Sequence, residues 1–441
     1  MSTVTGHDVV VVGAGLAGLA AARDLAAGGA DVLVVEARER VGGRVEQVQQ
    51  PDGRTVQLGG EVVGSSHTAY QELVAELGLS LVPSYVAEPG ELTYALHEAV
   101  YVGASRTWFS AADHDSMARV EERFAELAAR VDPDDPWSHP DAAALDRTSV
   151  QQWLVAEQAT PRVRRALEVA QLGLSAGSLE RTSLLALLRK CATTESHGLY
   201  SYSEWENLRV AEGSATVALR MAEQLGDRVR CAAPVRAIKT AAGDCSVQLD
   251  DGELLRCAAV VSAVPAGPFR DIETSGVSDA RLESLHRQRH ALAAKFVAAY
   301  ARPFWRDRGQ NGLSESEGIL GSSWPQGEGV LSALVPPERL AAYVATGRRF
   351  RRGEALAELA RWFGPEALEP VATYERLWGT DRWTQGYITQ WRPGDVLGIG
   401  PLHGTHEPPF YVCGSDQWVA GYMEGAVRTG RAAARAALEH G

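Results

Sequence analysis

The chain has 441 residues, 45% of them apolar and 22% charged, as in a globular protein long enough for two interwoven domains. Its formal net charge of −13 excludes nucleic acid as a partner, because phosphate would be repelled, and is compatible with a cationic substrate. The five cysteines form no CxxC pair, which excludes a disulfide framework, a thiol-redox motif and a zinc ribbon.

The N-terminal sequence enters a strand and a Gly-rich turn directly, with no basic region before it. We therefore expect no signal peptide. No stretch approaches the roughly 20 apolar residues that a membrane span requires, so we expect a cytoplasmic protein that does not contact a membrane.

The first eighty residues alternate between strand and helix signals. Short continuous valine runs are typical of a parallel sheet that is covered on both faces. The pattern predicts strands at His7–Val12, Asp31–Glu36 and Val56–Val63, a helix at Leu16–Ala27, and a second helix capped by Thr68 and ending at Gly78.

Residues 83–207 are predicted to be largely helical. Met117, Val120, Phe124, Leu127 and Val131 recur at steps of three and four and form one apolar helical stripe. Further along, Ser149 with Gln152 makes a capping box, and Thr160-Pro161 starts another helix.

Strand signals return after a capped helix that runs from Ser214 to Gly226. We expect strands at Val229–Cys231, Val235–Thr240, Ser246–Leu249, Leu254–Cys257 and Ala258–Val264, and an apolar run at 290–300. A helix near Glu354–Phe363, a strand at Phe410–Cys413 and a helix at Gly425–Leu438 follow.

Strand-rich segments at the start, middle and end of the chain predict discontinuous domains. The expected fold class is α/β, with a Rossmann-like FAD-binding domain (GR2-type) interwoven with a discontinuous α+β substrate domain. The first would comprise residues 1–82, 208–285 and 386–441, and the second 83–207 and 286–385.

The turn Gly13-Ala14-Gly15-Leu16-Ala17-Gly18 is a GxGxxG fingerprint between a strand and a helix. Its glycines allow the tight turn, the approach of a pyrophosphate and close helix–strand packing, with the phosphates at the positive helix end. Glu36 follows 18 residues later at a strand end, where it can accept ribose hydroxyls. Together they predict dinucleotide binding.

Three further motifs carry a family resemblance. Glu36-Ala37-Arg38-Glu39-Arg40-Val41-Gly42-Gly43-Arg44 is followed by Leu58-Gly59-Gly60, and then by Gly414-Ser415-Asp416 with Gly421-Tyr422-Met423-Glu424-Gly425-Ala426. In this order the motifs resemble those of the flavin amine oxidase family, which includes monoamine oxidases, polyamine oxidases and L-amino-acid oxidases. The resemblance spans nearly the whole chain and implies FAD as the cofactor.

The residues in these motifs fit an FAD site. Arg44 is suited to pair with the pyrophosphate, Gly59-Gly60 to pass close to the flavin ring, and the helix beginning near Tyr422 to stabilise the reduced flavin. By the resemblance, Asp416 contacts the ribityl or phosphate region and the backbone of Val235 touches adenine. The expected FAD contacts are Gly13, Gly15, Ala17, Gly18, Glu36, Ala37, Arg38, Gly43, Arg44, Gly59, Gly60, Val235, Gly414, Asp416 and Met423.

Lys295 is one of only three lysines, and it lies in an otherwise apolar run. A buried lone ammonium must be paired, neutral or functional, whereas a lysine at a strand end often extends to water instead. The stretch from Lys295 to Pro303-Phe304-Trp305 is similar to the family segment whose lysine is linked through a water to flavin N5. The resemblance therefore implies a catalytic Lys295.

The family's substrate pocket often has two aromatic residues in front of the flavin. Tyr422 matches one, but the second position holds Ile388, and Tyr387 occupies the place of the cysteine that binds flavin covalently in monoamine oxidases. We therefore expect non-covalent FAD. Trp383, Tyr387 or Trp391 could supply the missing aromatic wall, and Glu61 could pair with a substrate cation.

The predicted reaction is hydride transfer from the α-carbon of a neutral amine to flavin. Reoxidation by O2 then gives H2O2, and the imine is hydrolysed to an aldehyde. The partners are a small-molecule amine and O2, with no metal, because His286 and His290 lack the Glu of an HExxH motif. The oligomeric state is open, and a homodimer is one alternative.

Three other interpretations remain open at this point. An L-amino-acid oxidase would need an arginine to bind the carboxylate, but residues 59–68 contain none. Desaturases and dehydrogenases of the protoporphyrinogen-oxidase type share the N-terminal motifs but generally not the C-terminal motif or this lysine. Rab GDP-dissociation inhibitors share the fold without using flavin.

Overall fold

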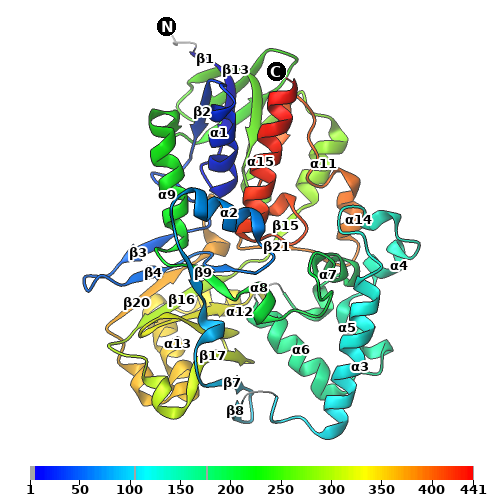
Figure 1. Ribbon diagram of the computed structural model, residues 1–441, viewed down its shortest axis with the longest axis vertical. Helices are drawn as coiled ribbons and strands as arrows, with labels where there is room; N and C mark the ends of the chain where they lie inside the picture. Colours follow the sequence, from blue (N-terminus) through cyan, green and yellow to red (C-terminus); the bar gives the residue numbers. More distant parts are fainter. Residues whose placement is uncertain (1–4, 104–105, 175–176, 441) are drawn as a thin grey trace.

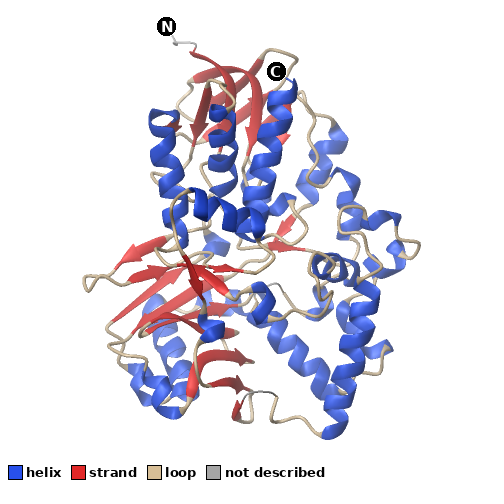
Figure 2. Ribbon diagram, viewed as in Figure 1, coloured by secondary structure: helices blue, strands red, loops and turns tan. Residues whose placement is uncertain are grey.

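The structure is a computed structural model that describes residues 5–103, 106–174 and 177–440. Figure 2 shows one group of strands behind long helices at the top of the view and a second group of strands below it. Strand β1 (Thr5–Val12) and the C-terminal end of helix α15 (Tyr422–His440) both lie at the top of the view (Figure 1).

The upper sheet has the strand order β10-β2-β1-β13-β12-β11-β14, with β22 also paired to β13. Its central strands are parallel, and Val10 of β1 lies opposite Leu33 of β2 and Val260 of β13. The predicted strands at Leu254–Cys257 and Ala258–Val264 are one continuous strand. The bounds are β1 Thr5–Val12, β2 Val32–Val35, β10 Val229–Arg230, β11 Val235–Lys239, β12 Cys245–Leu249, β13 Leu254–Ser262, β14 Glu273–Ser275 and β22 Phe410–Val412.

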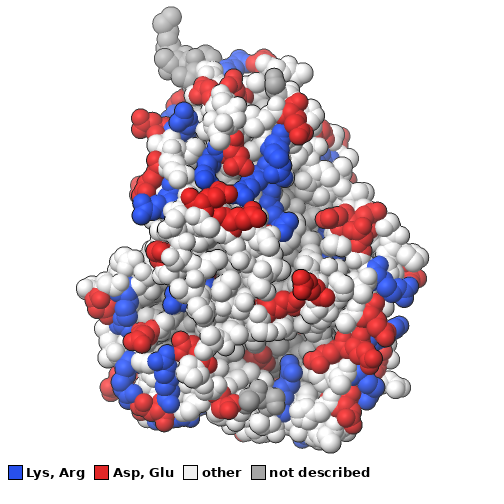
Figure 3. Space-filling model, viewed as in Figure 1, with Lys and Arg blue, Asp and Glu red and all other residues white. Residues whose placement is uncertain are grey.

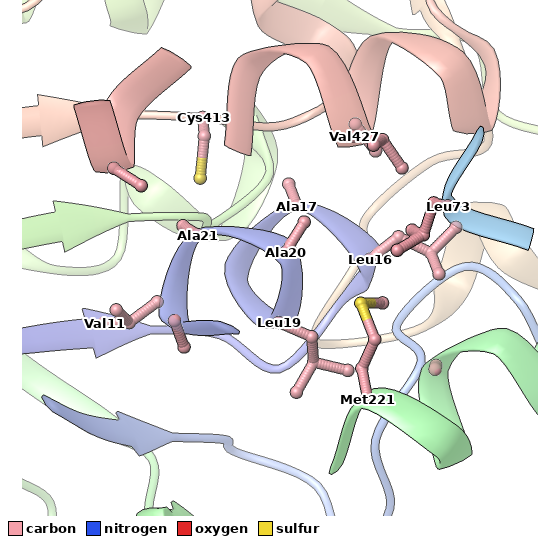
Figure 4. Packing of buried hydrophobic residues seen from close by; sticks show 14 of the residues in the cluster. Val11, Leu16, Ala17, Leu19, Ala20, Ala21, Leu73, Met221, Cys413 and Val427 are labelled. Carbon is pink, nitrogen blue, oxygen red and sulfur yellow. The ribbon is translucent and has the colours of Figure 1, made fainter. Parts of the chain in front are cut away.

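Helices α1 (Leu16–Ala27) and α15 (Tyr422–His440) lie side by side against this sheet (Figure 1). Small residues allow the close approach, since a Cβ at Gly430 would lie 2.3 Å from the carbonyl oxygen of Ala17. Figure 4 shows Ala17 and Ala20 of α1 facing the same core as Val427 of α15. The first and last helices of the chain therefore share one core, which α9 (Ser214–Leu225) completes.

The expected strand at Val56–Val63 is interrupted. Thr55–Gln57 forms β4, paired with β3 (Gln47–Gln49), and Val62–Val63 forms β5. The chain leaves the strand conformation between them because Gly59 packs against other backbone, and a Cβ there would lie 2.1 Å from the carbonyl oxygen of Arg44.

Helix α2 (Thr68–Glu76) begins one residue after its N-cap, which is His67 rather than the predicted Thr68. The buried Glu424 carboxylate of α15 accepts the backbone N–H groups of Ala69 and Tyr70. A negative charge in this position satisfies free donors at the positive end of a helix.

The lower sheet has the strand order β20-β16-β19-β18-β17-β7-β8. Two of these strands, β7 and β8, lie in the segment 83–207, which was predicted to be largely helical. The segment is mainly helical only after β8. The apolar run at 290–300 supplies β16, whose residues are all buried between β19 and β20. The bounds are β7 Glu91–Ala95, β8 Val100–Gly103, β16 Ala294–Ala299, β17 Gln310–Ser316, β18 Ser322–Gly327, β19 Val330–Val335 and β20 Ala372–Arg376.

A helical layer completes the lower half of the molecule and packs around Phe124 and Trp153. The capping box of Ser149 with Gln152 and the cap at Thr160 are confirmed. Its helices are α3 Ala111–Ala128, α4 Ala142–Arg147, α5 Val150–Ala156, α6 Pro161–Gly173 and α7 Leu184–Cys191.

The remaining elements join these parts. Strands β6 (Leu81–Pro83) and β9 (Leu208–Val210) pair with each other, and β15 (Arg289–His290) pairs with β21 (Thr389–Gln390). The other helices are α8 Tyr202–Trp205, α10 Ala266–Phe269, α11 Asp279–Arg287, α12 Pro337–Ala345, α13 Arg348–Phe363 and α14 Asp395–Ile399.

Acidic and basic side chains are interspersed on the face shown in Figure 3. Some of them link helices, as Glu76 of α2 does by pairing with Arg23 of α1 and Arg431 of α15. None of the helices in the described ranges combines the length and apolar character that crossing a bilayer requires.

Candidate active site

A cavity of about 470 Å³ is lined by residues from both sheets and the helical layer. Its lining includes the Gly-rich turn after β1, Glu36 after β2, Lys295 of β16 and Tyr422 at the start of α15. Parts of the chain that lie far apart in sequence therefore border one space.

All but two of the site residues predicted from the sequence line this cavity. The exceptions are Gly18 and Asp416. The lining residues among those predicted are Gly13, Gly15, Ala17, Glu36, Ala37, Arg38, Gly43, Arg44, Gly59, Gly60, Glu61, Val235, Lys295, Trp383, Tyr387, Ile388, Gly414, Tyr422 and Met423.

The turn after β1 has the geometry that a phosphate site needs. Gly13 has a positive φ of 105°, and a Cβ at Gly18 would lie 1.9 Å from the Gly13 carbonyl oxygen. Gly15 borders the cavity, and a Cβ there would meet no atom within 4 Å. Gly18 thus serves helix packing, whereas Gly15 leaves open space before the N-terminus of α1, where a pyrophosphate fits.

Glu36 is buried at the end of β2, and each carboxylate oxygen accepts one backbone N–H. The donors are Ala14, at 2.8 Å, and Arg38, at 2.9 Å. Two bonds leave further lone pairs on the carboxylate. Glu36 is therefore fixed in place and still able to accept ribose hydroxyls.

Arg44 has an internal partner in addition to its place on the cavity wall. Its guanidinium donates two hydrogen bonds to the buried Asp416 carboxylate, at 2.8 and 2.9 Å, and one to the Ser415 hydroxyl. Burial alone would raise the pKa of Asp416, but Arg44 and the nearby His290 bring it well below its usual range. Asp416 thus orients Arg44 instead of lining the cavity.

Lys295 is 2% exposed, and its ammonium donates hydrogen bonds to Glu61 at 2.7 Å and to the Gly59 carbonyl oxygen at 3.0 Å. Burial lowers the pKa of Lys295, and the Glu61 charge opposes this shift. Trp324 and Gln326 also donate to Glu61. The structure therefore gives Glu61 a protein partner in place of the predicted substrate cation, and it places both groups beside Gly59-Gly60.

Tyr422 lies in a strained conformation beside other aromatic side chains. Its φ is +60°, a left-handed value that costs a non-glycine residue about 1–2 kcal/mol. Its ring stacks on Trp205, and its hydroxyl lies 2.9 Å from that of Tyr200. Trp205 and Tyr200 thus surround Tyr422 with aromatic side chains, and Trp383, Tyr387 and Trp391, the residues predicted to supply the missing aromatic wall, also line the cavity.

Several cavity residues were not identified from the sequence. They come from the turn after β6, from α7 and from the segment around α8, and they are Tyr85, Lys190, Tyr200, Tyr202 and Glu206. The run from Leu199 to Glu206 holds three aromatic and two acidic residues, a composition that could have marked it. Lys190 could have been found from the scarcity of lysine.

Glu206 is an acceptor for two tyrosines on the cavity wall. Tyr85 and Tyr200 donate their hydroxyls to separate oxygens of its carboxylate. Burial raises the pKa of Glu206, while these hydrogen bonds favour its charged form. The hydroxyl contact between Tyr200 and Tyr422 extends this network to the start of α15.

Among the described residues, no group of histidine, cysteine and acidic side chains could hold a metal ion.

Comparison with known proteins settles the family. The family model for flavin-containing amine oxidoreductases matches residues 16–438. The chain belongs to this family. It is 31% identical to putrescine oxidase of Kocuria rosea, over 100% of this chain and 96% of that protein.

Solved structures of related amine oxidases have the same fold. A double mutant of putrescine oxidase, made in a redesign of cofactor binding, has a TM-score of 0.90 and 30% identity, covering 99% of this chain and 100% of that one. Cyclohexylamine oxidase from Brevibacterium oxydans has a TM-score of 0.88 and 27% identity, covering 98% and 99%.

This chain is therefore an FAD-dependent oxidoreductase that acts on amines at the CH–NH2 group. Its fold is the α/β fold of FAD-binding amine oxidases. The L-amino-acid oxidase, the desaturase-like dehydrogenase and the non-enzymatic alternatives are not favoured.

Proposed function

We propose that this amine oxidase holds FAD along the cavity and oxidises the α-carbon of a neutral amine between the flavin and Tyr422. The observation that carries the proposal is the continuity of the cavity lining. The same space borders Glu36 and the Gly-rich turn, and also Lys295 and Tyr422. Bound FAD would supply the hydride acceptor, and the protein would supply position and electrostatics.

The proposed cofactor contacts follow the order of the cavity wall. Glu36 accepts hydrogen bonds from the adenosine ribose hydroxyls, Arg38 lies beside the ribose, and the backbone of Val235 contacts adenine. The N–H groups of the Gly-rich turn and Arg44, oriented by Asp416, hold the pyrophosphate. Gly59-Gly60 and Met423 border the flavin ring. Lys295, paired with Glu61, would lie beside the flavin and hold a proton there.

FAD is proposed to be held without a covalent bond. Tyr387 stands on the cavity wall at the position of the linking cysteine in monoamine oxidases, and the described residues that line the cavity include no cysteine. The proposed domain division keeps residues 1–82, 208–285 and 386–441 for FAD and residues 83–207 and 286–385 for the substrate. The strands of the upper and lower sheets come from these two sets of segments, respectively.

The proposed substrate is an amine with an apolar substituent. Besides Tyr422, apolar side chains from several elements border the cavity, and they include Leu174, Leu187, Leu313, Trp324 and Trp391. Burial of an apolar substituent against them contributes about 25 cal/mol per Å² of its surface. Oxidation of the amine by the bound flavin would give an imine that hydrolyses to an aldehyde, and reoxidation of the reduced flavin by O2 would give H2O2.

The test is anaerobic reduction followed by reoxidation. The purified yellow protein is mixed without oxygen with a panel of monoamines, diamines and amino acids, and the visible flavin absorbance is recorded. We expect amines to bleach the flavin and air to restore its colour with release of one H2O2 per imine. A protein without flavin, or a flavin reduced by amino acids alone, would contradict the proposal.

A further inference from the structure

Lys190, in the last turn of α7, occupies a cage of three aromatic rings. Its ammonium lies 5.3 Å from the centre of the Tyr200 ring, 4.9 Å from that of Trp205 and 5.1 Å from that of Tyr422. Such cages attract cations, because the ring faces carry negative potential. In this protein the cage is filled by a side chain of the protein itself.

The two lysines of the cavity wall have different surroundings. Lys295 is neutralised by direct contact with Glu61, whereas no described residue forms a hydrogen bond or an ion pair with the Lys190 ammonium. Lys190 is partly buried and lines the cavity. Its positive charge therefore faces the space that a substrate would enter.

The charged and titratable groups that face Lys190 come from four segments. Glu206, on the segment after α8, is the nearby anion, but both of its oxygens accept tyrosine hydroxyls. Cys191 follows Lys190 on α7, and His67 precedes α2, while Tyr200 and Tyr422 form two walls of the cage. None of these groups other than Glu206 supplies a negative charge unless a thiol or phenol ionises.

We propose that Lys190 is a specificity-determining residue that keeps cationic groups out of the Tyr422 end of the cavity, so that the amine binds there only in its neutral form. The inference rests on the proposed function, because it assumes that the substrate amine approaches Tyr422. Tyr422 would present one region of its ring to Lys190 and the rest to the cavity. An aromatic cage without Lys190 would attract a substrate ammonium. Because Lys190 fills the cage, the ammonium would instead meet a like charge there.

The pH dependence of this exclusion follows from the surroundings of Lys190. Burial lowers the pKa of Lys190, and Cys191 and Glu206 partly oppose the shift. Lys190 therefore loses its charge at a lower pH than an ordinary lysine does. Exclusion of a permanently charged probe should weaken as the pH rises through this pKa.

The experiment compares two probes that differ only in charge. Phenethyltrimethylammonium is a permanent cation, and its carbon isostere, with a quaternary carbon in place of nitrogen, is neutral. Dissociation constants for the FAD-loaded protein are measured from the change that each probe causes in the flavin spectrum. The variants are Lys190→Met and Lys190→Arg, and the matched control is Lys239→Met, on an exposed lysine of β11.

We expect Lys190→Met to bind the cation at least about tenfold more tightly than the unmodified protein, since the like charge that occupies the aromatic cage is removed. The neutral isostere should change by less than about twofold, and Lys190→Arg and Lys239→Met should resemble the unmodified protein. Equal cation binding in Lys190→Met and the unmodified protein would overturn the proposal, as would an unmodified protein that prefers the cation.

The outcomes separate this proposal from the proposed function. If amines reduce the flavin but the cation binds equally to both forms, only the role of Lys190 fails. If no amine reduces the flavin of the unmodified protein, the proposed function fails regardless of the probes. Flavin content and melting temperature of each variant show that the cavity has remained intact.

Discussion

The buried pair of Lys295 and Glu61 gives the sharpest stability prediction. Both side chains are almost fully buried, at 2% and 5% exposure, and their charged atoms lie 2.7 Å apart. Removing one partner of such a pair costs about 3–5 kcal/mol, because the other charge stays buried without compensation. The Glu61→Gln substitution should have this effect on Lys295, because it removes the carboxylate charge and leaves the ammonium with neutral acceptors, the Gly59 carbonyl and the new amide oxygen.

The reverse substitution, Lys295→Met, should cost less. Glu61 would keep the N–H donors of Trp324 and Gln326, which stabilise a carboxylate. The double variant should lose less free energy of unfolding than the sum of the losses in the two single variants, because neither buried charge remains in it without its partner.

The assay is thermal unfolding at fixed pH and fixed FAD concentration. For a chain of 441 residues, the unfolding entropy is about 0.9 kcal/mol per degree. A loss of about 3–5 kcal/mol therefore lowers Tm by about 3–5 °C. Additive shifts in the double variant, or a shift below about 1 °C for Glu61→Gln, would refute the account of this pair.

Three further predictions test other parts of the site. Gly18→Ala should lower the free energy of unfolding by about 1–3 kcal/mol even without FAD, because the new Cβ would clash with the Gly13 backbone. Gly15→Ala should leave the unfolding of the FAD-free protein unchanged, because its Cβ meets no atom, but it should reduce the amount of FAD that remains bound on purification. Asp416→Asn should weaken FAD binding roughly tenfold or more in a fluorescence titration, because it removes the charged partner that orients Arg44; unchanged affinity would count against that role. Burial, aided by Lys190, holds the pKa of His67 at about 3 against an ordinary 6.5, so the folded state binds fewer protons than the unfolded state between these values. The free energy of unfolding should then fall as the pH drops through this window, and His67→Asn should reduce the slope by about 1.4 kcal/mol per pH unit, which urea titrations at several pH values would measure.

The parts of this molecule that could be predicted were those whose signals are local. The GxGxxG turn and Glu36 lie within one strand–helix–strand unit, so their spacing alone placed them. Lys295 was found because a lysine in an apolar run is unusual, and β16 is indeed buried throughout.

The parts that could not be predicted depend on contacts between distant segments. Arg44 and Asp416 are separated by 372 positions, and no pattern in either motif indicates that they bind each other. The break in the expected strand at Val56–Val63 arises from contact between Gly59 and the Arg44 backbone, which alternation of side chains does not encode.

The aromatic cage was missed for the same reason. Lys190, Tyr200, Trp205 and Tyr422 come from three segments that meet only in the folded chain. The family's motif positions point to Ile388 for the second aromatic residue, and nothing in that motif indicates Tyr200 or Trp205.

A crystal structure of the protein purified with its flavin would test the central claim most directly. We expect FAD in the cavity, with its adenosine ribose at Glu36 and its ring between Gly59-Gly60 and Tyr422, and with the Lys295 ammonium on the side of the reactive nitrogen. A flavin bound elsewhere, or a ring turned so that Lys295 and Tyr422 both lie outside its reach, would contradict it.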